Sequence, residues 1–179
     1  GLLFLLFGFI SYYSNQEQTF SIAAVQKRFS ELEKAGAAQA KLLLKQIDKG
    51  QKLPTSNELI YHLYQNEVLF GWSSNQLPIG RYKTAVFPDN GLIKLNNGYY
   101  FSQSVQKDSI TSCVSFCLLK EYEFSNAYLN AANPKFWKQQ FAVNLTGERK
   151  NAIFDSKQQL VFYATPFAQN TNSKEENGG

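Results

Sequence analysis

A single long helix is the feature that most constrains the fold of this chain. From about Asn15 to Asp48, apolar or small residues recur at steps of three and four, the spacing of one face of an α-helix. Gly50 and Leu53-Pro54 then end the pattern. Two partners are open for this face: the chain's own sheet, or the same helix of a second chain. The stripe consists of Ile22, Val25, Phe29, Leu32, Gly36, Ala40, Leu43 and Ile47.

After Asn57 the hydrophobic period changes to that of strands. Residues 59–64 and 68–72 flank the polar turn Gln65-Asn66-Glu67, which predicts a β-hairpin. Asn-Gly turns occur at Asn90-Gly91 and Asn97-Gly98. The order predicts an α+β fold, a long N-terminal helix packed on an antiparallel sheet with short helical insertions. Further strands are expected at 92–95, 99–105, 110–120, 141–145, 152–154 and 160–164, and a short helix at 124–132, ended by Asn133-Pro134.

The first dozen residues carry no charge and consist mostly of Leu and Phe. The run is too short for a full membrane span, which needs about 20 apolar residues, and it lacks the features of a secretory signal. We expect residues 1–12 to be the outer half of a truncated transmembrane helix that ends at the interfacial pair Tyr12-Tyr13. The first basic residue after the run is Lys27, which favours a non-cytoplasmic location for the domain after the run. The alternative is a buried N-terminal helix of a soluble protein.

The net charge of +4 arises from one segment of a chain whose 44% hydrophobic and 18% charged residues are typical of a globular domain. Between residues 27 and 52, seven basic residues stand against three acidic ones at helical spacing. We interpret this as a solvated helix face rather than a nucleic-acid patch, because no basic cluster with interleaved aromatics is present further along the chain. The basic residues are Lys27, Arg28, Lys34, Lys41, Lys45, Lys49 and Lys52; the acidic ones are Glu31, Glu33 and Asp48.

Two cysteines, Cys113 and Cys117, lie in a predicted strand on the face that also carries Leu119. Four residues along a strand span about 13 Å, whereas a disulfide needs Cα atoms within about 7 Å. We therefore expect two buried, reduced thiols. His62 is the only histidine, so no metal site or metal cofactor is predicted, and a structural role in its strand is favoured for it.

The sequence offers more for binding than for catalysis. It contains no nucleophile elbow, zinc-protease helix or phosphate-binding loop, and Glu121 and Glu123 are interpreted as a strand end rather than a catalytic pair. Aromatic residues make up 15% of the chain, and several stand beside polar groups at strand ends, the mixture that a small-molecule pocket needs. Such aromatics are also common core residues. The candidate ligand-binding residues are Trp72, Asn75, Tyr100, Lys120 and Tyr122.

Four segments in order resemble the outer sensing domains of bacterial membrane-bound sensor histidine kinases. The run 59–75 resembles their hairpin with a Trp-Ser-x-Asn end, and 97–100 their Asn-Gly-aromatic-Tyr strand start. The run 118–129 resembles their strand followed by Asn-x-Tyr-Leu, and 133–136 their Asn-Pro-x-Phe stop. The resemblance implies a periplasmic Cache/PAS-like sensor domain without catalysis of its own, anchored in the inner membrane. A second membrane helix and a kinase core would belong to the same protein.

From the pattern and the resemblance together we expect four parts. These are a truncated transmembrane helix (1–12), a stalk helix (13–50), a PAS/Cache-like sensor domain (51–168) and a disordered tail (169–179). The expected partners are the membrane, an unknown small-molecule or envelope signal, and a second copy. The copy would pair along Ile22, Val25, Phe29 and Leu32, since the stalk has little domain beside it. The alternative function is a membrane-anchored envelope binding or structural protein without a kinase.

Overall fold

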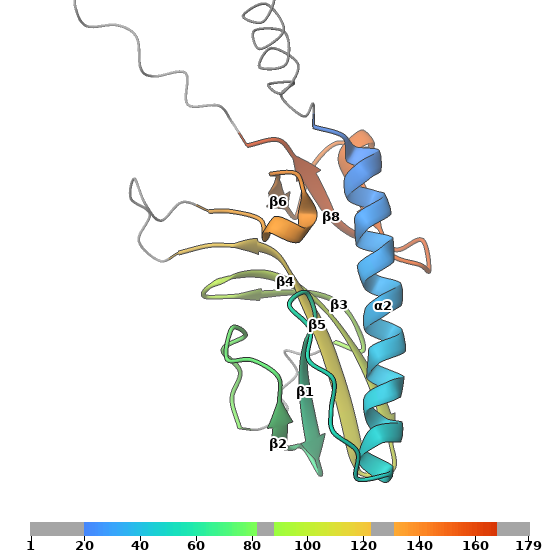
Figure 1. The fold of residues 1–179 in the computed structure, drawn as a ribbon. Coiled ribbons are helices and arrows are strands. Elements are labelled where there is room, and N and C mark those ends of the chain that lie inside the picture. The colour runs from blue at the N-terminus through green and yellow to red at the C-terminus, as the bar shows by residue number, and fades with distance from the viewer. Residues whose placement is uncertain (1–19, 82–87, 123–130, 168–179) are drawn as a thin grey trace, which may run out of the picture.

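The computed structural model describes residues 20–81, 88–122 and 131–167. It has the predicted α+β class, with one long helix lying along a five-stranded antiparallel sheet and a smaller three-stranded sheet near the start of the helix (Figure 1). The elements are α2 (Ile22–Asp48), β1 (Ile60–Gln65), β2 (Val68–Trp72), β3 (Asn90–Leu95), β4 (Gly98–Lys107), β5 (Ile110–Lys120), η1 (Lys135–Trp137), β6 (Ala142–Asn144), η2 (Arg149–Asn151), β7 (Ala152–Phe154) and β8 (Leu160–Thr165).

The helix α2 begins later than predicted. Ser21 has extended backbone (φ −128°, ψ 111°), and its side chain accepts a hydrogen bond from the N–H of Ala24, so it satisfies one of the free donors at the helix start. The predicted stalk of residues 13–50 is therefore not one continuous helix, because the chain at Ser21 is not helical. The predicted end of the helix is confirmed, since Gly50 follows the C-cap with a φ of +61°.

The larger sheet has the strand order β2-β1-β5-β4-β3, all antiparallel, and is the PAS/Cache-like sheet that was predicted. All five of its strands were predicted within a few residues. The β1–β2 turn uses Asn66 and Glu67, both at positive φ (48° and 68°), which suits the twist of a tight hairpin. At the β3–β4 turn Gly98 has a φ of +140°, and a Cβ there would lie 2.1 Å from the carbonyl oxygen of Leu119.

One face of this sheet packs against α2 and forms the main core. Phe29 of α2 is fully buried, and its ring meets Phe101 of β4 and Phe116 of β5 edge-on, with centroids 4.9 and 5.7 Å apart. The same ring meets Phe162 of β8 at 5.9 Å. One helical side chain therefore joins the two sheets.

The smaller sheet, with order β6-β8-β7, covers the first part of α2. Val25, Phe29 and Leu32 are at most 2% exposed and belong to this core. The prediction that this part of the helix projects without a domain beside it is wrong. A dimer through α2 stays a prediction, but the predicted seam is occupied by the protein's own sheets.

The cysteine predictions are confirmed: Cys113 and Cys117 are buried thiols that form no disulfide. Leu119 differs from its prediction, because it packs with the helix-facing core rather than with the cysteines. The cause is a bulge at the end of β5. Its pairing with β4 shifts register there, between Tyr99 and Tyr100 of β4. An extra residue in one strand breaks the alternation of faces.

Several predictions fall on residues outside the described ranges. These are the membrane segment 1–12, the predicted disordered tail 169–179 and residues 124–130 of the predicted short helix. Ala132, the last residue of that predicted helix, instead pairs with Lys120 as an isolated β-bridge. Within the described ranges, no helix combines the length and the apolar character that crossing a membrane requires.

Candidate functional site

The face of the five-stranded sheet turned away from α2, here called the polar face, is buried and yet rich in polar groups. Residues opposite each other on neighbouring strands share a face, and the register places His62, Cys113 and Ser104 in one row across β1, β5 and β4. Ser115 donates a hydrogen bond to Ser102 at 2.9 Å. Eight of its polar or thiol residues are at most 4% exposed: His62, Tyr64, Tyr100, Ser102, Thr111, Cys113, Ser115 and Cys117.

Burial keeps the ionisable groups of the polar face neutral. It lowers the pKa of His62 to about 4 and raises the pKa of the Cys117 thiol to about 12. It also raises the pKa of the Tyr64 and Tyr100 hydroxyls. Desolvation disfavours the charged form of each group. At neutral pH the face therefore offers hydroxyl, thiol and imidazole groups without net charge, which suits hydrogen bonding to a polar molecule.

The loop of residues 73–81 folds against this face. Leu77 is 2% exposed and packs in the cluster that contains Ile60, Tyr64 and Tyr100. The carbonyl oxygen of Gln76 accepts hydrogen bonds from the Asn97 amide at 2.8 Å and from the Tyr100 hydroxyl at 3.3 Å. The loop is thus fixed to the β3–β4 hairpin through one backbone carbonyl.

A pocket of about 460 Å³, here called the end pocket, opens where the polar face meets the ends of β1 and β5. Ile60 and Cys117 belong to both the polar face and the pocket lining. The charged residues of its lining are Glu58, Lys120 and Lys135. The pocket therefore combines apolar and thiol surface with three charged groups.

One wall of the end pocket is the turn that contains η1, and this turn is clamped to β5. The Asn133 amide donates to the carbonyl oxygen of Leu118 at 2.7 Å, and its side-chain oxygen accepts from the N–H of Phe141 at 2.6 Å. The Trp137 indole N–H donates to the carbonyl oxygen of Cys117 at 2.8 Å. Two side chains thus bind the carbonyl groups next to the β5 bulge, and the wall is held by the sheet.

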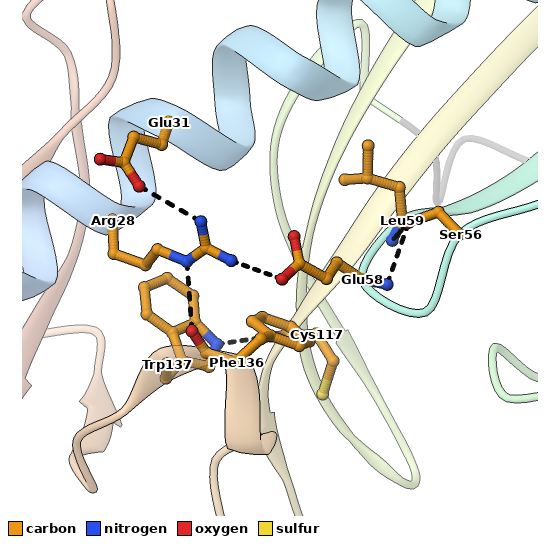
Figure 2. A network of polar contacts seen from close by, with 8 residues as sticks. All are labelled: Arg28, Glu31, Ser56, Glu58, Leu59, Cys117, Phe136 and Trp137. Carbon is orange, nitrogen blue, oxygen red and sulfur yellow. Dashed lines mark hydrogen bonds and ion pairs between the residues drawn. The ribbon is translucent and has the colours of Figure 1, made fainter.

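Arg28 of α2 joins this wall to the opposite one, as Figure 2 shows. Its guanidinium donates to the carbonyl oxygen of Phe136 at 3.2 Å, to the Glu58 carboxylate at 2.6 Å and to the Glu31 carboxylate at 3.2 Å. Glu58 is positioned in turn by Ser56, whose hydroxyl accepts hydrogen bonds from the N–H groups of Glu58 and Leu59. A helix residue is therefore bonded to both sides of the pocket.

The predicted ligand-binding residues are distributed unevenly around this site. Tyr100 is buried in the polar face, and Lys120 lines the end pocket. Trp72 lies opposite His62 on the edge strand β2 and is 53% exposed. Asn75 is exposed in the loop 73–81, next to Gln76, and Tyr122 follows the end of β5 and is 46% exposed. Only Tyr100 and Lys120 are thus placed inside the candidate site.

Sequence reasoning missed Arg28, Glu58 and Phe136. Arg28 and Glu58 are 30 positions apart, and Arg28 and Phe136 are 108 apart, so no local pattern connects them. The one signal was Asn133-Pro134, which was interpreted only as a helix stop. A buried Asn before a Pro also indicates a side chain that caps backbone groups, which is its role here.

The described residues give little support for a metal site or for a catalytic pair of carboxylates. Within 20–81, 88–122 and 131–167, no group of three or more His, Cys, Asp or Glu side chains is placed to hold a metal ion. Glu121 forms an ion pair with Lys94, and Glu123 lies outside the described ranges. Comparison of the chain with family models, curated proteins and solved structures gave no significant match.

Proposed function

We propose that this chain is the extracytoplasmic signal-sensing domain of a membrane-bound sensor histidine kinase, without catalysis of its own. The polar face would receive a small polar molecule, and α2 on the opposite side of the same sheet would carry the response toward the membrane. The observation that carries the proposal is the buried polar face itself. Its hydroxyl, thiol and imidazole groups supply the donors and acceptors that a small polar ligand needs, beside the apolar surface of Ile60 and Leu77.

The two faces are coupled because they share strands. In β5, Phe116 contacts the Phe29 ring of α2, while its neighbours Ser115 and Cys117 face the polar side. A shift of β5 caused by a ligand must therefore change the packing of α2, since close-packed cores do not deform freely. A ligand moves such an equilibrium only by its different affinities for the two states.

Binding can be tested on the isolated chain by amide and side-chain NMR, with a panel of small polar metabolites added one at a time. The proposal expects at least one compound to shift the signals of Tyr100, Ser102 and Ser115. Tryptophan fluorescence gives a second readout, since Trp72 is exposed and Trp137 is buried. Trp72→Phe separates the two emissions. Compounds that shift only surface signals on α2 would count against the polar face.

The kinase and the location need separate tests. The coding sequence beyond Gly179 is expected to encode a second membrane helix and a phospho-accepting histidine module. A sequence without them would favour the alternative, an envelope binding or structural protein. A reporter inserted after Ser74 in the full-length protein is expected to be active only outside the cytoplasm, and activity inside would contradict the proposed location.

A further inference from the structure

The charges around the end pocket are not balanced. Glu58 is the acidic residue of the lining, and its carboxylate is already paired with Arg28 at 2.6 Å. Lys120 and Lys135 line the same pocket. Neither lysine has an acidic partner among the described residues, where the remaining ion pairs involve other lysines. Among the described residues of the lining, the uncompensated charge is therefore positive, which favours an anion.

The polar groups of the lining suit an organic anion. Asn57 and Gln76 line the pocket beside the two lysines, and Ile60 provides apolar surface. Small-molecule sites combine apolar walls with a few convergent polar groups in this way. A volume of about 460 Å³ lies within the ordinary range for such ligands.

The response to occupancy depends on Arg28, because it is bonded to both walls. Glu58 belongs to the wall before β1 and Phe136 to the wall that comes after β5, and both residues line the end pocket. An anion held by the lysines would lie beside the Glu58 carboxylate and repel it. If the walls separate, one guanidinium cannot keep both contacts, and the first turns of α2 lose a connection to the domain.

We infer that the end pocket binds a small organic anion, carboxylate or phosphate, between Lys120 and Lys135, and that Arg28 transmits its occupancy to α2. The inference rests on the proposed sensing function and adds to the polar face a neighbouring site, the end pocket, with its ligand class and its regulation. Coupling between two sites is reciprocal. Loss of the Arg28 contacts must therefore also change the affinity of the pocket.

The test uses tethered charges, so no natural ligand is needed. Asn57 is exposed at the pocket rim, and Asn57→Cys can be labelled through a disulfide with a sulfonatoethyl or a trimethylammonioethyl group. The anionic group is expected to enter between the lysines and to increase amide hydrogen exchange in residues 22–32 several-fold. The cationic group, of matched length, is expected to stay in solvent and leave exchange unchanged. Unsubstituted protein treated with both reagents controls for reaction at Cys113 and Cys117.

The role of Arg28 is tested by repeating the labelling in Arg28→Gln and Glu58→Gln backgrounds. In both, exchange in residues 22–32 is expected to start higher and to respond little to the anionic label. Glu58→Gln leaves the helix untouched, so it serves if Arg28→Gln disturbs folding. Equal effects of the two labels, a full response without Arg28 or Glu58, or no response at all would each overturn the inference. None of these results would contradict the proposal that the polar face binds a ligand, because the metabolite panel tests that proposal separately.

Discussion

The two faces of the five-stranded sheet are both buried, but their chemistry differs. The face toward α2 is filled by aromatic rings, among them Phe101 and Phe116 around Phe29. The polar face buries His62, Ser102 and Ser115 to the same degree. Burial of apolar surface stabilises a fold without requiring particular partners, whereas each buried polar group needs one. The helix-facing side therefore stabilises the fold without special partners, whereas the stability of the polar face depends on its hydrogen bonds.

The largest change in the free energy of unfolding is expected for a substitution on the side of the sheet that faces α2. Phe29→Ala removes the ring that contacts both sheets and is expected to lower the free energy of unfolding by about 3–5 kcal/mol. Urea denaturation measures the change. Leu42→Ala, on the same helix but 44% exposed, is the control, and its expected change is within about 0.5 kcal/mol. Similar losses for both variants would contradict the assignment of the core.

The polar face should make stability depend on pH. His62 has a folded pKa of about 4, against an ordinary value of about 6.5, so the unfolded chain binds its proton more readily. The contribution of His62 to the free energy of unfolding is therefore fully present above pH 6.5 and is lost as the pH falls toward 4. Between pH 7 and pH 5 the free energy of unfolding is expected to fall by about 2 kcal/mol.

His62 is the only histidine, so the assignment is direct. In His62→Gln the fall between pH 7 and pH 5 should largely disappear in urea titrations repeated at each pH. If the variant keeps the full pH dependence, carboxylate groups cause it, and His62 is not a neutral buried group in the folded protein.

The serine pair of the polar face should show strong coupling. Ser102→Ala leaves the Ser115 hydroxyl, which is fully buried, without this acceptor and is expected to cost about 1–3 kcal/mol. Removing both hydroxyls should cost less than the sum of the two single changes. A double-mutant cycle measures the coupling. Additive effects would mean that the hydroxyl groups are satisfied by other partners.

The smallest change in the free energy of unfolding is expected for the ion pair that joins the two walls of the end pocket. Glu58→Gln breaks an ion pair whose side chains are 26% and 41% exposed, so solvent screening limits the loss to about 1 kcal/mol or less. The loss should shrink further at high salt. A larger, salt-independent loss would show that the bridge is part of the structural core rather than an adjustable contact.

The sequence predicted those features that depend on neighbouring residues. The β1–β2 hairpin was predicted from a polar Asn66-Glu67 turn between apolar runs, and the two unbridged cysteines were predicted from strand spacing. The sequence could not decide which surface the apolar stripe of α2 meets. Val25 and Phe29 fit a coiled coil and a sheet equally well by spacing, and only the tertiary fold selects the sheet.

Most residues of the candidate site could not be predicted from the sequence, for a related reason. Tyr100 and Lys120 were found because aromatic and charged residues stand at strand ends, but the same argument selected Trp72, which is exposed on an edge strand. Which of two adjacent residues faces the site depends on register and on the bulge near Tyr99. Arg28 could not be found at all, because its partners lie far along the chain.

The residues that flank the chain between β5 and the η1 turn are bonded to each other. This pairing affects how the length of the chain between them can vary. Lys120 and Ala132 exchange two backbone hydrogen bonds, at 2.9 and 3.1 Å, and Asn133 is bonded to Leu118. The two ends of the intervening segment are therefore held together by the sheet, whatever lies between them. The entropic cost of lengthening such a closed loop grows only with the logarithm of its length. The number of residues between Lys120 and Ala132 can thus change at little entropic cost, because the pairing of these two residues holds the η1 turn to β5.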